Sequence, residues 1–149
     1  MTHPTLPRYR AACHCKAVRF LVAPPDGLSR VNRCNCSLCG MRGAVVVWTW
    51  LDGLEIVEGA HMLRLYTFHS GTARHYFCSL CGIYTHHQRR SEPAKYSVNV
   101  ACIEGVSPFD FADVPVYNGR DHRNDVAGPR VDPAGSLHYT SFEIPGDPA

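Results

Sequence analysis

The sequence has little that would place the protein in a membrane or on a nucleic acid. It has no run of about 18 apolar residues, the length that a membrane-spanning helix needs. Residues 1–8 include no apolar segment of the secretory type, so we expect a cytoplasmic protein. Charged residues are 19% of the chain and the formal net charge is only +2. A balance this weak, without a Lys/Arg tract, argues against a nucleic-acid partner.

Cysteine is the residue type that the chain groups most closely. Seven of the eight cysteines form three short clusters, which are C-x-C at 13–15, C-x-C-x-x-C at 34–39 and C-x-x-C at 78–81. Eight in 149 residues is below the roughly 8–10% of disulfide scaffolds, and a reducing compartment would keep these thiols free. No βαβ pattern surrounds either C-x-x-C, as thiol redox catalysis would require. The spacing therefore favours metal binding.

The first and last clusters together supply one complete ligand set for zinc. Zinc takes four ligands in a tetrahedral array, and Cys13, Cys15, Cys78 and Cys81 (the outer cysteine group) offer four sulfurs. Such an ion would tie the first strand to a distant hairpin. Structural zinc contributes about 10–16 kcal/mol in zinc-finger peptides, and whole domains are stable by about 5–15 kcal/mol. We expect loss of this ion to unfold the protein.

The middle cluster, Cys34, Cys36 and Cys39 (the central cysteine triple), supplies three sulfurs and leaves two interpretations open. A fourth protein ligand could close the site. Candidates are Cys102 and His14, His61, His75, His86 or His87. Alternatively the fourth position stays open, as in catalytic zinc sites. Three thiolates make zinc a poor activator of water but favour a further sulfur ligand held as thiolate. An open site therefore indicates thiol chemistry.

Short apolar or alternating segments separated by glycine and proline turns predict an all-β fold with little helix. Strands are expected at Ala17–Val22, Gly43–Trp50, Leu54–Val57, Met62–Phe68, Thr72–Phe77, Ile83–His87, Lys95–Ile103 and Leu137–Ile144. The first twelve residues are predicted to be an extended arm, and residues 118–135 a long loop. One short helix is expected at Ser107–Phe111, with Ser107 as its N-cap.

Four segments resemble the glutathione-dependent formaldehyde-activating enzyme family, which includes centromere-protein-V-like proteins. They are Cys13–Phe20, Cys34–Cys39, Phe77–Gly82 and Val98–Gly105. The resemblance covers about residues 11–112. It implies a single zinc domain over 1–149, with its core at about 11–112 and a C-terminal loop and strand at 113–149. It also implies a tent-like, zinc-clasped β fold like that of a small Rab nucleotide-exchange factor.

The resemblance also implies roles for the two cysteine sets and two Zn²⁺ ions per chain. The outer cysteine group, Cys13, Cys15, Cys78 and Cys81, would hold a structural zinc, and the central cysteine triple a catalytic one. The implied activity joins formaldehyde to glutathione to give S-hydroxymethylglutathione. This is the reverse of the bond cleavage for which carbon–sulfur lyases are named. A substrate thiolate would attack the carbonyl carbon. The alternative is a non-catalytic zinc β-module that binds a protein or nucleic-acid partner.

The chain departs from the family pattern after the third cysteine of the central triple. Relatives often carry a basic residue there, whereas Gly40-Met41 precede Arg42 in this chain. Arg42, Arg74 and Arg120 are unranked candidates to bind a glutathione carboxylate. Trp48 and Trp50 share a strand face and are expected to pack in the core or to wall a pocket. Cys102 is interpreted as a buried thiol rather than a ligand.

Overall fold

The computed structural model describes residues 5–143 and 145–146, which form three β-sheets with one short α-helix. The main sheet has the order β4-β9-β8-β7-β6, with all neighbours antiparallel. Its strands are β4 (Val46–Trp50), β6 (Leu63–Tyr66), β7 (Arg74–Cys78), β8 (Tyr84–Gln88) and β9 (Lys95–Asn99). The β6–β7 pair is the hairpin that the alternating pattern of its two segments predicts.

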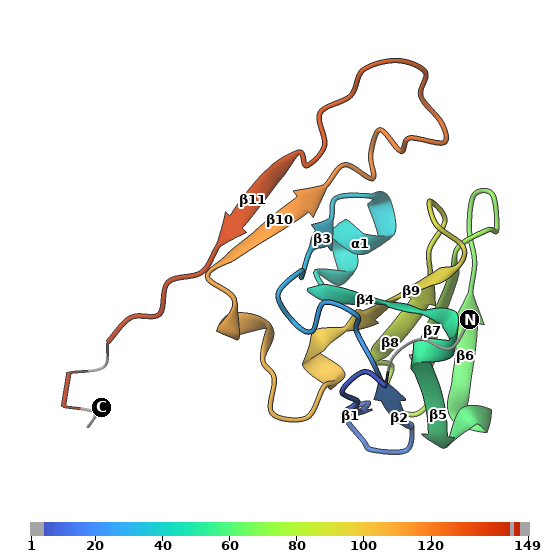
Figure 1. The fold of residues 1–149 in the computed structure, drawn as a ribbon, viewed down its shortest axis with the longest axis vertical. Helices are drawn as coiled ribbons and strands as arrows, with labels where there is room; N and C mark the ends of the chain where they lie inside the picture. The colour runs from blue at the N-terminus through green and yellow to red at the C-terminus, as the bar shows by residue number, and fades with distance from the viewer. Residues whose placement is uncertain (1–4, 144, 147–149) are drawn as a thin grey trace.

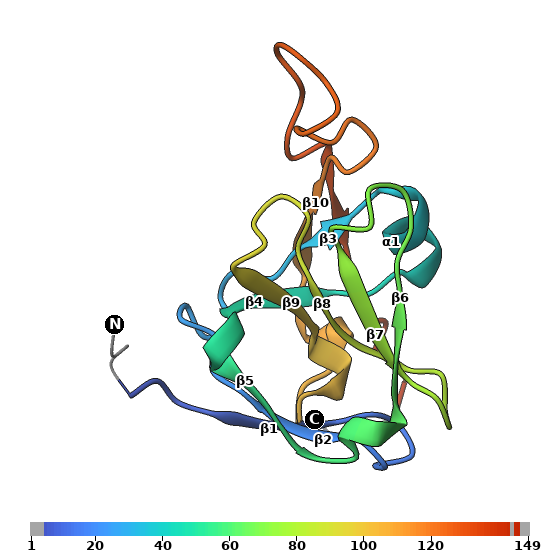
Figure 2. The same ribbon diagram turned by 90° about the vertical axis from the view of Figure 1, so that its right-hand side faces the viewer.

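Two smaller sheets flank the main one (Figures 1 and 2). The first has the order β1-β2-β5, from β1 (Tyr9–Ala12), β2 (Arg19–Val22) and β5 (Leu54–Glu58). The second has the order β11-β10-β3, from β3 (Arg33–Cys34), β10 (Asp113–Tyr117) and β11 (Gly135–His138). Strand β10 runs parallel to β3, with Tyr117 opposite Cys34. The chain that follows β10 therefore lies beside the central cysteine triple.

The core lies between the main sheet and the β1-β2-β5 sheet. Phe20 and Val22 on β2 pack with Val47 on β4 and Val98 on β9, and all four are buried. β-branched side chains suit these strands because they pack well on a pleated surface. Among the described residues, no helix is long and apolar enough to cross a membrane.

The all-β prediction is confirmed, and the 3₁₀ turn Pro108–Asp110 is capped by Ser107 as expected. Five elements differ from the prediction. The arm predicted over the first twelve residues ends in strand β1, and residues 1–4 lie outside the described residues. Helix α1 (Ser37–Arg42), β3 and β10 were not predicted. The strand predicted at Leu137–Ile144 begins earlier and is shorter, because only residues 135–138 pair with β10, and Ile144 lies outside the described residues.

Candidate metal centres

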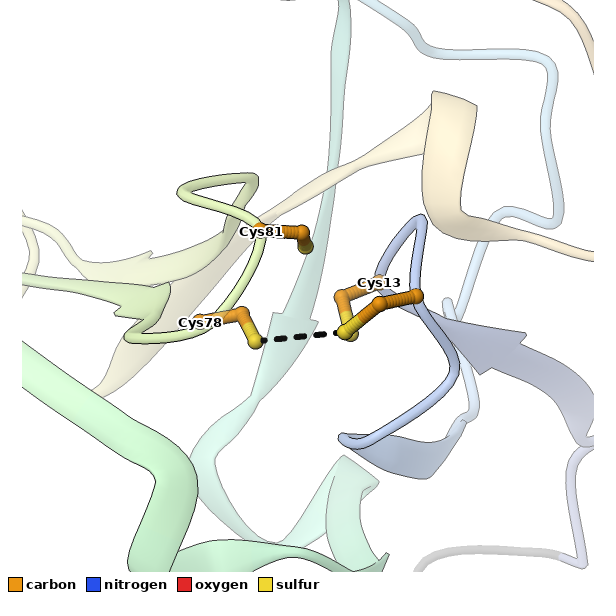
Figure 3. Close-up of side chains that lie close together, drawn as sticks. Cys13, Cys78 and Cys81 are labelled. Carbon is orange, nitrogen blue, oxygen red and sulfur yellow. Dashed lines mark hydrogen bonds between the residues drawn. The ribbon is translucent and has the colours of Figure 1, made fainter.

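The outer cysteine group comes together from two tight turns that are distant in sequence. Cys13 and Cys15 lie in the turn between β1 and β2, Cys78 ends β7, and Cys81 lies in the turn before β8. Their four Sγ atoms are within 4.8 Å of one another. Figure 3 shows the Cys78 sulfur facing the turn that carries Cys13. The two turns are thus positioned to share one ion.

Sulfur spacing in this group suits a tetrahedral zinc ion. Zinc–sulfur bonds of about 2.3 Å in a tetrahedron place the sulfurs about 3.8 Å apart. The Sγ atoms of Cys13 and Cys15 are 3.6 Å apart, and those of Cys15 and Cys78 are 3.7 Å apart. All eight cysteines are free thiols. Cys13 and Cys78 are 1% and 0% exposed, whereas Cys81 is half-buried and Cys15 is exposed, so the two turns hold an ion between the core and the surface.

The central cysteine triple is assembled on β3 and α1. Cys34 ends β3, Cys36 is the N-cap of α1, and Cys39 lies one turn into that helix. Backbone amides donate to the sulfurs: Cys36 N–H to Cys34 Sγ at 3.4 Å and Cys39 N–H to Cys36 Sγ at 3.3 Å. Such donors stabilise thiolates, the form that binds metal. The three sulfurs lie within 4.8 Å of one another, so this set can also hold an ion.

The thiols of the central triple favour a shared negative charge. Hydrogen bonds from Cys34 and Cys39 lower the pKa of the Cys36 thiol, and the amides of Cys39 and Leu38 lower it further. The hydrogen bonds of Cys39 to Cys34 and Cys36, together with burial, raise the pKa of Cys39. Arg42 Nη2 donates to Cys39 Sγ at 3.3 Å and brings a positive charge to the triple.

Within the described residues, no histidine, aspartate, glutamate or further cysteine joins the central triple. The candidates for a fourth ligand therefore lie elsewhere. Cys102 is buried and its thiol donates to the Tyr84 carbonyl at 3.6 Å, which confirms the interpretation of a buried thiol. His86 is buried against Phe20, Tyr76 and Tyr96. The other candidates, His14, His61, His75 and His87, are likewise outside this group.

The two cysteine sets differ in their surroundings, because a cavity of about 1090 Å³ borders only one of them in the described part of the chain. All three cysteines of the central triple line it, and among the described residues none of the outer group does. Of the residues that the structure describes, eight arginine or lysine side chains and three acidic ones line the cavity. The acidic side chains are all in ion pairs, whereas Arg42, Arg120 and Arg123 have no carboxylate partner among the described residues. The cavity therefore suits an anion.

Arg42 also connects the triple to two histidines on adjacent strands. Its Nη1 lies 3.2 Å from Nδ1 of His75, and its guanidinium carbon is 3.5 Å above the Tyr84 ring. His75 on β7 is opposite His87 on β8, and their rings stack at 4.7 Å. Burial, and then the charge of Arg42, lower the pKa of His75 to about 4. His75 and His87 are therefore neutral near pH 7, since burial also lowers the pKa of His87.

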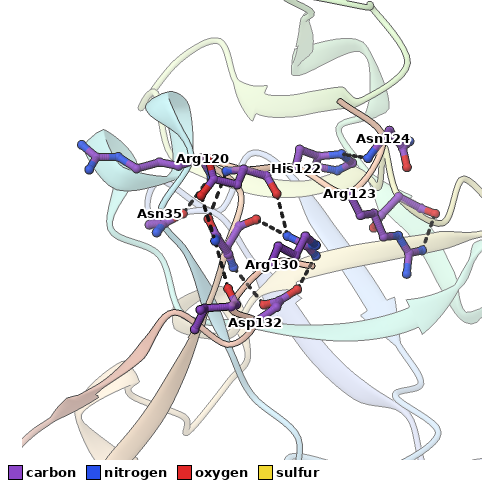
Figure 4. Close-up of polar contacts among 11 residues, drawn as sticks. Asn35, Arg120, His122, Arg123, Asn124, Arg130 and Asp132 are labelled. Atoms are coloured by element: carbon purple, nitrogen blue, oxygen red, sulfur yellow. Dashed lines mark hydrogen bonds and ion pairs between the residues drawn. The ribbon is translucent and has the colours of Figure 1, made fainter. Parts of the chain in front are cut away.

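The segment after β10 covers the other side of the triple. A Cβ on Gly119 would come within 2.3 Å of Cys34 Sγ, so this backbone lies directly against the sulfur. The Arg120 amide donates to Asn35 Oδ1 at 3.0 Å. Figure 4 shows the Arg120 side chain extending away from the polar network around Arg130 and Asp132. That network fixes the loop, because Arg130 donates to the carbonyls of Asn118 and Asp121.

The structure also ranks residues that the sequence left unranked. Arg42 and Arg120 line the cavity, whereas Arg74 does not and donates to Tyr76 instead. Trp48 lines the cavity and Trp50 does not, although their rings are in edge contact at 5.1 Å.

Comparisons with known proteins agree with this architecture. The sequence model of the glutathione-dependent formaldehyde-activating enzyme family matches residues 8–114. A crystal structure of a Rhodobacter sphaeroides protein is similar at 50% sequence identity and a TM-score of 0.70, over 72% of this chain and 98% of that chain. The match to the family ends within β10, before Gly119 and the loop that carries Arg120.

Proposed function

Because the chain belongs to the glutathione-dependent formaldehyde-activating enzyme family, we propose that it joins glutathione to formaldehyde or a related aldehyde. The observation that carries this proposal is the placement of only one of two cysteine sets on a cavity. A structural zinc site is completed by four protein ligands, whereas a catalytic site keeps one position open to a substrate.

The outer cysteine group is assigned a structural Zn²⁺, held by Cys13, Cys15, Cys78 and Cys81. Four sulfurs at near-tetrahedral spacing satisfy the ion without any external ligand. The ion would crosslink the β1–β2 turn to the β7–β8 turn, which are more than sixty residues apart in sequence. Its binding free energy would then be part of the folding free energy.

The central triple, Cys34, Cys36 and Cys39, is assigned the second Zn²⁺ and the catalytic role. When bound there, zinc would keep a substrate thiol in its nucleophilic thiolate form at neutral pH. The protein itself supplies the positive charge of Arg42 beside Cys39, which offsets the negative charge that a fourth thiolate would add. Arg120 and Arg123 line the same cavity and are available to bind the carboxylates of glutathione.

The reaction is an addition of glutathione to the aldehyde, which needs no oxidant and releases no leaving group. The glutathione sulfur forms a bond to the carbonyl carbon, and the π-electron pair of the carbonyl moves onto its oxygen. That oxygen takes a proton from solvent, which replaces the proton lost when the thiol ionised. The reverse direction breaks the carbon–sulfur bond, as a carbon–sulfur lyase does. We also propose a cytoplasmic location, where thiols stay reduced.

Paired serine substitutions test the division of labour between the two cysteine sets. Cys36→Ser should give folded protein with one zinc per chain, because the outer group is intact. Cys81→Ser should give unfolded or insoluble protein, because it removes a ligand from the ion that holds two turns together. Zinc content by mass spectrometry and circular dichroism report both properties. Equal misfolding of the two variants would contradict the assignment.

A further inference from the structure

Two buried side-chain nitrogens in the described part of the chain have no hydrogen-bond partner, and they belong to neighbouring residues. They are Arg42 Nε and His75 Nε2. His75 is only 5% exposed, and both residues line the cavity beside the central triple. A buried donor without a partner is destabilising, because it has lost its hydrogen bonds to water and gained none from the protein. Such atoms at a cavity wall indicate a place where a ligand supplies the missing acceptor.

Arg42 determines which nitrogen of His75 carries the proton. A guanidinium has only donors, so the contact between Arg42 Nη1 and His75 Nδ1 at 3.2 Å requires Nδ1 to accept. The proton of the neutral ring is then on Nε2, which makes that atom a donor. Packing also fixes the ring, because it stacks on His87 at 4.7 Å and lies 5.8 Å from the Phe68 ring. The protein thus holds one oriented N–H group without an acceptor.

We propose that His75 Nε2–H binds the aldehyde oxygen and stabilises the negative charge that develops on it during addition. This inference rests on the proposed function. As the carbon–sulfur bond forms, the carbonyl π pair moves to oxygen, and the hydrogen bond strengthens with the growing charge. His75 keeps its proton throughout, and the oxygen is protonated by solvent. Arg42 acts as a positioning residue, because it sets the tautomer without touching the aldehyde.

His86 shows what a structural histidine looks like in the same sheet. It is equally buried, at 3% exposed, and burial lowers its pKa to about 4. Its Nδ1 lies 2.9 Å from the Thr85 hydroxyl, its ring stacks on Tyr76, and it does not line the cavity. His75 differs in facing the cavity-lining Arg42 and in keeping a donor unused.

Two amide variants separate the donor from the Arg42 contact. In His75→Asn, the amide is placed near the former Nδ1, so it can accept from Arg42 but offers no donor at the Nε2 position. In His75→Gln, the longer side chain returns an N–H donor near that position. His86→Asn is the matched control for loss of a buried ring. Each zinc-loaded protein is tested for zinc content, calorimetric glutathione binding, and kcat and KM with glutathione and formaldehyde.

The inference predicts that His75→Asn keeps two zinc ions and binds glutathione within about threefold of wild type. Its kcat should fall about 100-fold, the lower end for loss of one oxyanion donor, while His75→Gln stays within about tenfold of wild type. Unchanged kcat in His75→Asn, equal losses in the two variants, or loss of zinc in His75→Asn would each overturn it. A wild-type protein that does not bind glutathione would instead refute the proposed function.

Discussion

Gly119 is the residue whose substitution tests most sharply whether the C-terminal segment belongs to the central cysteine site. A Cβ at this position would lie 2.3 Å from Cys34 Sγ, 2.8 Å from Cys36 Cβ and 3.1 Å from the Cys36 amide nitrogen. Favourable contacts between such atoms are at about 3.5–4.0 Å. In Gly119→Ala, either Cys34 or the loop must therefore move by about 1 Å.

The cost falls on metal binding because Cys34 has little freedom to move. Its sulfur accepts from the Cys36 amide, and its backbone is paired with β10. Overpacking of a tightly packed site costs about 1–3 kcal/mol. If the strain arises when the triple closes on an ion, it weakens zinc binding at that site. A change of 1.4 kcal/mol is a factor of ten in affinity, so the zinc affinity should fall about 5- to 150-fold. The outer cysteine group should be unaffected.

Competition with a chelator of known zinc affinity measures this change for each of the two ions. The expected result is that Gly119→Ala releases one zinc at lower chelator concentration and retains the other as wild type does. Gly135→Ala is the matched control, because Gly135 lies in the same C-terminal segment and a Cβ there meets nothing within 4 Å. Two zincs with wild-type affinity in Gly119→Ala would refute the placement of this segment.

Three further predictions concern Arg42, Cys102 and His86. Arg42→Gln should raise the calorimetric Kd for glutathione about tenfold, because it removes the cation that offsets an added thiolate beside Cys39; an unchanged Kd would contradict that role. Cys102→Ala should keep both zinc ions and lose about 1–2 kcal/mol in urea unfolding, because the buried thiol only packs and donates to the Tyr84 carbonyl; loss of an ion would make Cys102 a ligand. Burial lowers the pKa of His86 from 6.5 to about 4, so as the pH falls the unfolded chain binds this proton before the folded protein does. The unfolding free energy of wild type should therefore fall by up to about 3 kcal/mol relative to that of His86→Phe between about pH 6.5 and pH 4. Parallel stability curves for the two proteins over that range would contradict this.

The grouping of the cysteines could be predicted from the sequence because each cluster is local. Two sulfurs separated by one or two residues on a tight turn point to the same place, whatever the rest of the fold does. Counting them therefore gave the outer group of four and the central triple of three, which is how the structure assembles them. The open role of the triple and its residue assignments stay predictions.

Arg42 could have been ranked from the sequence if the short helix had been recognised. Cys39 and Arg42 are three residues apart, so they share one face of α1. The displaced basic residue, which departs from the family pattern, thus contacts the third cysteine through helix geometry. Gly43 as the C-cap was the available signal, whereas the N-cap, Cys36, is not a residue type that marks a helix start. Six residues are too few for hydrophobic periodicity to reveal a helix.

The remaining site residues depend on pairing between distant strands. His75 faces His87 only because of the β7–β8 register, which no local pattern specifies. Gly119 reaches Cys34 only because β10 pairs in parallel with β3, across more than eighty residues of chain. Within one strand the two-residue period does suffice, because adjacent residues face opposite sides: His87 on β8 lines the cavity and His86 lies in the core.

Calorimetric titration of reduced glutathione into zinc-loaded protein tests the central claim that the triple is a thiol-binding site. The account predicts saturable binding to wild-type protein that carries two zincs per chain, and no binding to folded Cys36→Ser that carries one. Absence of heat at millimolar glutathione with both zincs in place would contradict the account. The second site would then be closed to thiols, as expected for a zinc β-module that binds a macromolecular partner.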